Sequence, residues 1–264
     1  MKSYEQQFTS DKTMPLIPTL VRIDGRSFSS WTRGLEKPYD INMHNIMRAT
    51  TEELVKEFSG VVVGYTQSDE ISLVLLQRGS SSQLAFDGKI FKMNSNIASY
   101  ATAVFNSLVP EYLPEKVGHL ATFDCRTWQV PNEEEACNYL IWREQDARRN
   151  SISGAAQSVY SHKELHKKNS KDMLDMLIAK GINWNNYPDF FKRGTYLART
   201  FVDRKYTTEE LERLPARHEA RSNPDLVVTR SETVELDLGG ANALSKIENR
   251  VEYIFDDDTP ILRS

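Results

Sequence analysis

The order of the predicted elements places this 264-residue chain in the α+β class, with a ferredoxin-like β-α-β-β-α-β unit over residues 18–130. Short runs of β-branched residues alternate with stretches whose apolar residues recur at helical spacing. Five residues separate the second and third runs, which is short enough for a hairpin. We therefore expect one domain over residues 1–130 and, packed on it, a mainly helical region over residues 131–264.

Local signals set the boundaries of these elements. The first helix should begin at the N-cap Asp40 and end at Gly60, with apolar residues at helical spacing between them. The second helix should cover residues 97–108 and stop near Pro110, because proline does not continue a helix. Four strands are predicted, at residues 20–23, 61–65, 71–76 and 120–124.

Beyond residue 130 the signals are mostly helical. Asn132 is a candidate N-cap for a helix that runs to Gln157, and Thr207 with Glu210 forms a capping-box pattern. A further helix is expected over residues 171–180, a strand over residues 195–201, and an acidic surface segment over residues 252–258.

Composition excludes several classes of protein. Lys and Arg number 33 against 37 Asp and Glu, so the net charge of -4 excludes a wholly basic nucleic-acid coat but allows a local basic face. Two cysteines cannot form a disulfide framework. The N-terminus lacks a signal-peptide pattern, and no apolar run reaches the ~18–20 residues that cross a bilayer. A cytoplasmic protein with no membrane partner is expected.

Two acidic residues are predicted to meet at one edge of the sheet. Asp24 ends the first strand and Asp69 lies in the hairpin turn, and these strands are neighbours in this topology. Carboxylates suit Mg²⁺, and two such ions can activate an attacking oxygen and stabilise a leaving one. Gly25 would let a backbone carbonyl or a phosphate come close. The alternative is that both acids are ordinary turn residues.

Five blocks of sequence follow one another in a specific order. They are Val21-Arg22-Ile23-Asp24-Gly25-Arg26 with Lys37-Pro38, Gly64-Tyr65-Thr66-Gln67-Ser68-Asp69-Glu70, Phe123-Asp124-Cys125-Arg126, Trp142-Arg143-Glu144-Gln145-Asp146, and residues 185–195. Together they span most of residues 18–205. In order and spacing they resemble the signature blocks of the tRNA-histidine guanylyltransferase family and its Thg-like relatives.

The resemblance implies a catalytic domain similar to the palm of polymerases and nucleotidyl cyclases. It implies nucleotide addition in the 3′–5′ direction at the 5′ end of tRNA. The 5′-monophosphate is first activated with ATP, and the 3′-hydroxyl of GTP or another nucleoside triphosphate then attacks the activated end. A homotetramer is also implied.

The same resemblance assigns roles to residues of the blocks. Two Mg²⁺ ions would be held by Asp24, the carbonyl of Gly25, and Asp69. The catalytic residues would be Asp24, Asp69, Glu70 and Lys37. Nucleotide binding would involve Gly25, Arg26, Ser27, Phe28, Ser68, Lys92 and Arg126. For Lys37 and Lys92 the alternative is a solvated surface charge.

One block departs from the family pattern. Enzymes that act on tRNA-His carry a His-x-Asn-Asn block, where this chain has Arg148-Arg149-Asn150-Ser151. The departure favours the Thg-like branch, which repairs 5′-truncated tRNA by templated addition. The alternatives are addition of G to tRNA-His, a palm-type nucleotide cyclase, and a non-catalytic RNA-binding module. The last conflicts with retention of both aspartates.

A basic segment is the candidate surface for tRNA. Residues 143–171 hold seven Lys or Arg against three Asp or Glu, a local charge of +4. Phosphate contacts dominate nucleic-acid affinity, so this segment is expected to bind tRNA. A solvated helical face of mixed charge is the alternative. The candidate residues are Arg143, Arg148, Arg149, Asn150, Lys163, Lys167 and Lys168.

Overall fold

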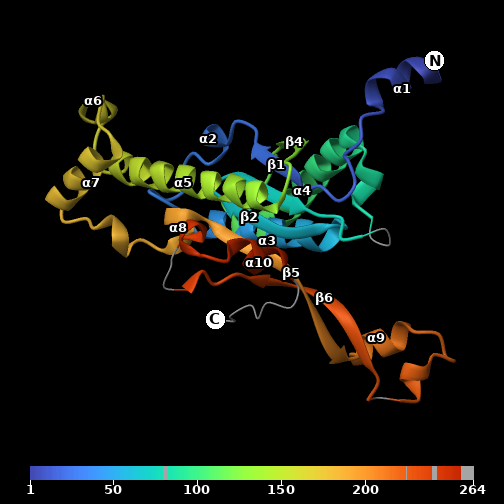
Figure 1. Cartoon of the computed structure of the whole chain (residues 1–264). Helices are drawn as coiled ribbons and strands as arrows, with labels where there is room; N and C mark the ends of the chain where they lie inside the picture. The colour runs from blue at the N-terminus through green and yellow to red at the C-terminus, as the bar shows by residue number, and fades with distance from the viewer. Residues whose placement is uncertain (80–82, 224, 240–242, 257–264) are drawn as a thin grey trace.

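A six-stranded antiparallel sheet forms the centre of the computed structural model, which describes residues 1–79, 83–223, 225–239 and 243–256 (Figure 1). The strands lie in the order β4-β1-β3-β2-β5-β6, and each neighbouring pair is antiparallel. Their bounds are β1 Thr19–Gly25, β2 Val61–Gln67, β3 Glu70–Leu75, β4 Phe123–Gln129, β5 Thr195–Lys205 and β6 Val227–Glu235. The α+β prediction is confirmed.

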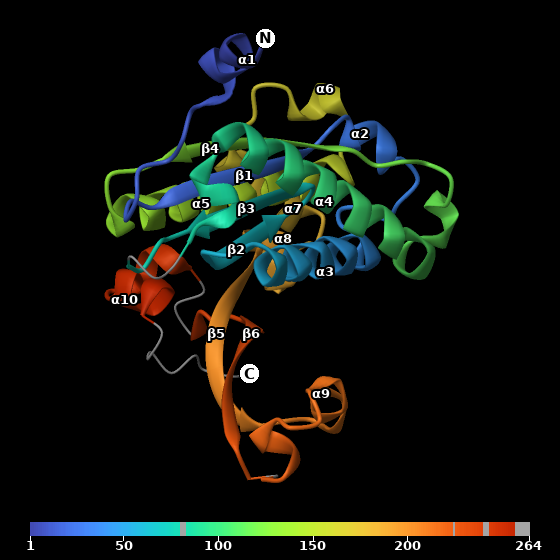
Figure 2. The same cartoon turned by 90° about the vertical axis from the view of Figure 1, so that its right-hand side faces the viewer.

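Helices cover both faces of this sheet (Figure 2). Helices α3 (Ile41–Glu57) and α4 (Ile90–Tyr112) pack on one face, and α5 (Glu133–Gln157) crosses the other. No helix in the described ranges is long and apolar enough to cross a membrane. The shorter helices are α1 Lys2–Thr9, α2 Phe28–Trp31, α6 His162–Leu165, α7 Ser170–Ala179, α8 Asp189–Arg193, α9 Thr208–Arg213 and α10 Arg250–Phe255.

The two faces of the sheet have separate apolar cores, as alternation along the strands dictates. Val21 and Ile23 of β1 point into the core under α3 and α4, whereas Leu20 joins the core under α5. The polar residues Arg22 and Asp24 share the α5 face with Leu20, because residues two apart project to the same side. The catalytic candidate Asp24 therefore emerges beneath α5.

Helix signals in the sequence were accurate where a cap exists. The Asp40 side chain accepts hydrogen bonds from the N–H groups of Asn42 and Met43, and the Asn132 side chain accepts one from Glu135. The capping box of Thr207 and Glu210 is present before α9. These caps satisfy N–H groups that have no partner inside the helix.

Several predicted boundaries were wrong. Helix α4 runs through Pro110, which sits in its last turn, where the missing N–H costs one hydrogen bond and the Leu113 N–H still reaches Val109. Strand β4 begins at Phe123, and Leu120 is 79% exposed before it. The segment expected to be acidic surface contains Ile254 and Phe255, both buried in the core under α5; residues 257 and 258 lie outside the described residues.

The C-terminal region adds two strands to the sheet, of which only β5 was expected. The first residues of β5, Thr195 to Ala198, pair with β2. From Arg199 onward β5 pairs with β6 alone, so the two strands project as a ribbon with α9 near its tip (Figure 1). The sheet thus continues past residue 130, and the division into two domains there stays a prediction.

Packing between β2 and α3 leaves no room at Gly64. A Cβ atom there would lie 2.8 Å from Cγ2 of Thr51 and 2.9 Å from Cγ2 of Val55. We expect Gly64→Ala to lower the free energy of unfolding by about 1–3 kcal/mol, because overpacking a tight core forces neighbours to shift. Denaturant unfolding followed by circular dichroism measures this change.

Gly154→Ala in α5 is the matched control, because a Cβ atom there meets nothing within 4 Å. In a helix interior this change should raise stability by up to ~1 kcal/mol. Equal effects of the two substitutions would contradict the close approach of β2 and α3.

Candidate active site

Three carboxylates lie side by side at one end of the sheet. Asp24 at the end of β1 is directly opposite Glu70 of β3 on one side and Asp124 of β4 on the other. Directly opposed residues of antiparallel strands project to the same face. The hairpin turn Ser68-Asp69 joins β2 to β3 at this edge, and the Gly25 N–H donates to the Asp69 carbonyl at 3.1 Å. The structure thus brings together Asp24, Gly25 and Asp69.

Asp69 is held in a shielded position beside a second negative charge. Burial raises the pKa of its carboxyl, and the nearby charge of Asp24 raises it further. The Ser68 hydroxyl donates to Asp69 Oδ1 at 3.0 Å and opposes this rise. Ser68 has a φ of 56°, a left-handed conformation uncommon outside glycine, so the turn is locally strained where it presents Asp69.

Two arginines hold Glu70 in place next to this pair. Arg143 of α5 donates from Nε and Nη2 to the two Glu70 oxygens at 2.6 and 2.7 Å. Arg22 Nη2 lies 2.7 Å from Glu70 Oε2 and 3.1 Å from Asp24 Oδ2. Burial raises the pKa of Glu70, and Arg143 counteracts it. Both partners of the Arg143 pair are about nine-tenths buried.

The prediction that Arg143 binds tRNA was therefore wrong. Its guanidinium faces the hairpin and Asp146, and its side chain is only 8% exposed. The position lies on the face of α5 that packs on the sheet, so a positive charge in the sequence was mistaken for a solvated one.

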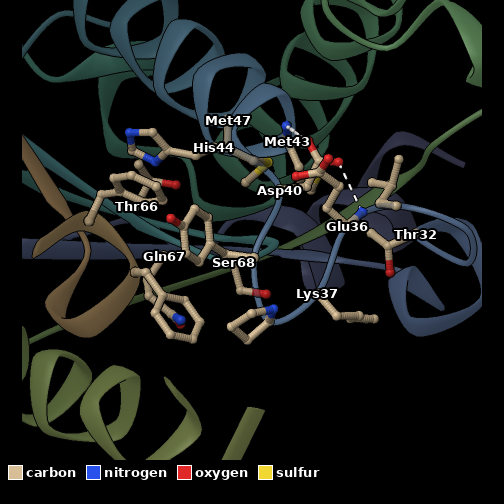
Figure 3. A pocket seen from close by; sticks show the side chains of 15 residues that line it. Thr32, Glu36, Lys37, Asp40, Met43, His44, Met47, Thr66, Gln67 and Ser68 are labelled. Atoms are coloured by element: carbon tan, nitrogen blue, oxygen red, sulfur yellow. Dashed lines mark hydrogen bonds between the residues drawn. The ribbon is translucent and has the colours of Figure 1, made fainter. Parts of the chain in front are cut away.

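A cavity of about 150 Å³ opens beside the turn (Figure 3). The loop between α2 and α3 forms one side through Lys37 and Asp40, and the end of β2 forms another through Gln67 and Ser68. The Glu36 N–H donates to Asp40 Oδ2 at 3.1 Å, which shapes the loop at the cavity. The structure thus places the predicted residues Lys37 and Ser68 on one cavity.

An aromatic wall lines this cavity, and sequence reasoning missed it. His44 of α3 stacks on Phe190 of α8 with ring centroids 4.0 Å apart. Tyr39 contacts the rings of Phe190 and Phe191 at 5.3 and 5.1 Å. Burial lowers the pKa of His44 to about 4, so the ring is neutral at physiological pH. These residues lie about 150 positions apart, and only the pairing of β2 with β5 brings them together.

Phe28 is a core residue, contrary to the prediction that it binds nucleotide. Its ring packs against Trp31, Phe105 and Phe123 and is 3% exposed. A Cβ atom at Gly25 would lie 2.4 Å from this ring, so Gly25 is required for the fit of α2 as well as for access to its carbonyl. Arg26 and Ser27, at the end of this turn, are both exposed.

Arg126 and Lys92 have different positions. Arg126 of β4 lies opposite Arg22 of β1, and its side chain is 60% exposed. Its Nη2 atom lies 3.3 Å from Asp124 Oδ1, so Arg126 flanks the carboxylates at this end of the sheet. Lys92 instead lines a groove between α1 and α4. The start of α4 packs on the far part of β4, where the Thr127 hydroxyl donates to Asn94. Within this chain, Lys92 is not brought to Asp24 and Asp69, and its role in nucleotide binding stays a prediction.

The remaining tRNA candidates gather where α5 extends beyond the sheet, near α6 and α7 (Figure 1). Arg149 is 53% exposed and pairs with Asp146 at 2.8 Å. Arg148 lies over the Trp184 ring at 5.3 Å, and the Trp184 indole donates to the Ser151 hydroxyl. Exposed side chains complete the set: Arg148, Asn150, Lys163, Lys167 and Lys168.

The donor set at the edge fits Mg²⁺. Asp24 and Asp69 supply hard oxygen ligands, and their mutual repulsion is what a bound cation would relieve. Among the described residues, no group of three or more His, Cys, Asp or Glu side chains is arranged so that it could hold a metal ion by itself. Two carboxylates with a backbone carbonyl leave open positions, which phosphate oxygens complete in Mg²⁺ sites of this kind.

Comparison with known proteins shows the family of this chain. A family model described as Thg1, tRNAHis guanylyltransferase, matches residues 1–131. The tRNA(His) guanylyltransferase of Saccharomyces cerevisiae is 30% identical over 214 residues, covering 74% of this chain and 89% of that protein.

Solved structures show the same likeness. A bacterial Thg1-like protein in complex with ATP has a TM-score of 0.71 and 40% identity, covering 75% of this chain and 85% of that one. A bacterial Thg1-like protein in complex with GTP has a TM-score of 0.67 and 33% identity, covering 89% and 88%.

Fold and comparisons together define a palm-type nucleotidyltransferase. The chain belongs to the tRNAHis guanylyltransferase (Thg1) family.

The partly buried His44 makes stability depend on pH. Its pKa is about 4 when folded, against ~6.5 in the unfolded chain. The unfolded state thus takes up the proton first, and stability falls as the pH drops from about 6.5 to 4, by at most about 3 kcal/mol. We expect His44→Gln to lose this part of the pH dependence in denaturant unfolding at pH 7 and pH 4.5.

His162→Gln serves as the control, because His162 is exposed. It should leave the wild-type difference between the two pH values unchanged. A His44→Gln variant with the wild-type difference would show that His44 titrates normally in the folded protein.

Proposed function

We propose that this protein adds nucleotides in the 3′–5′ direction to the 5′ end of tRNA, with Asp24 and Asp69 as the ligands of two Mg²⁺ ions. The observation that supports it most is that these carboxylates meet at the end of the inner strands β1 and β3, beside a cavity. Bound there, Mg²⁺ would activate the attacking oxygen and stabilise the leaving one. The carbonyl of Gly25 would complete the protein ligands.

The cavity beside the turn is the proposed site for the base and ribose of a nucleoside triphosphate. Apolar and aromatic walls with a few polar groups are typical of such sites. From this cavity the triphosphate would reach Asp24 and Asp69 past Ser68, with Lys37 and Arg26 as exposed cations for its charge. Complexes of bacterial Thg1-like proteins with ATP and with GTP support both nucleotides as substrates.

The basic end of α5, with α6, is the proposed support for tRNA. After Arg143, α5 continues for fourteen residues to Gln157, away from the carboxylate edge. Arg149, Lys163, Lys167 and Lys168 are exposed along this path. Phosphates bound here would leave the 5′ end of the RNA near Asp24, and the salt dependence of affinity would report the contacts.

The finer proposal is templated repair of 5′-truncated tRNA. Its support is the Arg148-Arg149-Asn150-Ser151 block, in which Arg148 stands where enzymes that act on tRNA-His carry His. Ser151 of this block is buried and accepts a hydrogen bond from Trp184. The Ser151 hydroxyl therefore helps to hold the 184–186 turn and is not accessible to RNA. Guanylylation of tRNA-His is the second candidate, because the yeast relative has that name.

Loss of either aspartate should abolish nucleotide addition. Asp24→Asn and Asp69→Asn each remove one charged ligand, and electrostatic stabilisation of this kind is usually the largest catalytic term. We expect at least a 100-fold fall in addition of radiolabelled nucleotide to 5′-monophosphorylated tRNA, with unchanged circular dichroism. Asp175→Asn on α7, an exposed aspartate, is the control. Near-normal activity of either site variant would remove the metal assignment.

Substrate choice separates repair from guanylylation. We expect faster addition to a tRNA that lacks its first 5′ nucleotide than to intact tRNA-His. The added base should follow the opposing base when that base is varied through all four. The measurement is incorporation of each nucleotide supplied singly. Addition of G whatever base stands opposite, or preference for intact tRNA-His, would overturn the repair assignment and leave the nucleotidyltransferase assignment standing.

A further inference from the structure

A half-exposed tryptophan stands next to the carboxylate edge, and the site described above does not use it. Trp142 of α5 is 49% exposed, whereas Trp184 is 5% exposed and lies in a core. The indole N–H groups of Trp31 and Trp184 each donate a hydrogen bond. Within the described part of the chain, Trp142 and Trp128 have no such partner, and of these two only Trp142 is exposed. A half-exposed indole offers an open aromatic surface with a free donor, and this makes it a candidate contact surface for a planar ligand.

Two contacts connect this ring to the catalytic edge. The Arg143 guanidinium carbon lies 4.6 Å from the centroid of the Trp142 ring. The same guanidinium makes the bidentate pair with Glu70, the first residue of β3, which follows Asp69 and lies opposite Asp24. A chain of direct contacts thus leads from Trp142 through Arg143, Glu70 and Arg22 to Asp24.

Neighbouring aromatic rings also position Trp142. Tyr139, one helical turn away, packs against Trp142 with centroids 6.1 Å apart and meets Trp128 of β4 edge-to-face at 5.3 Å. Its hydroxyl forms a buried 2.8 Å hydrogen bond with Ser72 of β3. The three rings form a ladder from β4 along the flank of α5, so Trp142 would lose little freedom on binding a planar group.

Cations flank this ladder on both sides. Arg126, 60% exposed, shares its face of β4 with Trp128. Arg149, 53% exposed, lies two helical turns beyond Trp142 on the same flank of α5. Aromatic rings between arginines are the pattern of single-stranded nucleic-acid sites, where bases stack and cations hold the backbone.

We propose that Trp142 is a stacking platform for an unpaired nucleobase at the acceptor end of the RNA. This inference rests on the proposed function, because it assumes that RNA is the substrate. The ligand is a base of the substrate strand or of the opposing template strand at the growing end. Stacking accepts any base, so the platform orients the end while pairing decides which nucleotide is added.

The test asks whether the Trp142 indole and one particular base of the RNA contribute to the same contact. The probe is a fluorescent acceptor-stem RNA that lacks its first 5′ nucleotide, with abasic versions at the 5′-terminal position and at the template position. Kd is measured by anisotropy without nucleotide, for wild type, Trp142→Ala and Trp142→Phe. We expect Trp142→Ala to weaken binding of the complete RNA by roughly 10-fold, and Trp142→Phe to retain most of the affinity.

The decisive result is that the losses of affinity caused by Trp142→Ala and by one abasic change do not add. One abasic RNA should bind wild type as weakly as the complete RNA binds Trp142→Ala, with no further loss in that variant. Tyr4→Ala, which removes an exposed aromatic on α1, should not alter affinity for either RNA.

Three outcomes would overturn the proposal. Trp142→Ala and the abasic changes could weaken binding independently, the variant could bind every RNA like wild type, or it could change the oligomeric state in light scattering. The last would make the indole a contact between copies of the chain. Failure of the proposed function is distinguishable, because then no variant, wild type included, would bind the RNA or extend it.

Discussion

The bidentate pair between Arg143 and Glu70 is the interaction on which the candidate site depends. It joins α5 to the first residue of β3, directly after the turn that presents Asp69. Both partners are largely buried, so the pair is favourable only because its geometry is good and Arg22 and Asp146 supply further partners. Removing one partner would leave an unpaired buried charge and free the turn.

Charge balance at this edge follows from the register of the sheet. Asp24 of β1 is paired with Glu70 of β3 and with Asp124 of β4. Two residues back along the strands, Arg22 is paired with Arg126 on the same face of the sheet. The arginines pair with Glu70 and Asp124, and Arg22 also contacts Asp24, so the repulsion between Asp24 and Asp69 is offset only in part. A divalent cation is the natural counter-charge, and the phosphates of a nucleotide would then bind the cation.

Much of this arrangement could be predicted from the sequence, because its signals are local. The β-branched run before Asp24, the two-residue turn at Ser68-Asp69 and the caps at Asp40 and Asn132 each act within a few residues. The meeting of Asp24 with the turn then follows from the order of the elements alone.

The errors concern side chains whose environment depends on distant segments. Arg143 and Phe28 are buried because one face of α5 and one face of α2 pack on the sheet. Neither the charge of a residue nor its place in a sequence motif shows which face of a helix will be buried. The wall of Tyr39, His44 and Phe190 needs β5 beside β2. Strand β6 escaped prediction because a two-stranded ribbon has no buried face, so its residues lack a clear alternation of polar and apolar types.

The central claim is that Asp24 and Asp69 act as one metal site, and the most direct test is to count bound ions. Electron paramagnetic resonance of Mn²⁺ with a non-hydrolysable ATP analogue reports the ions bound per chain. The account predicts fewer ions in Asp24→Asn and in Asp69→Asn than in wild type, and no further loss in the double variant. Full Mn²⁺ binding by the double variant, or separate losses that add, would contradict it.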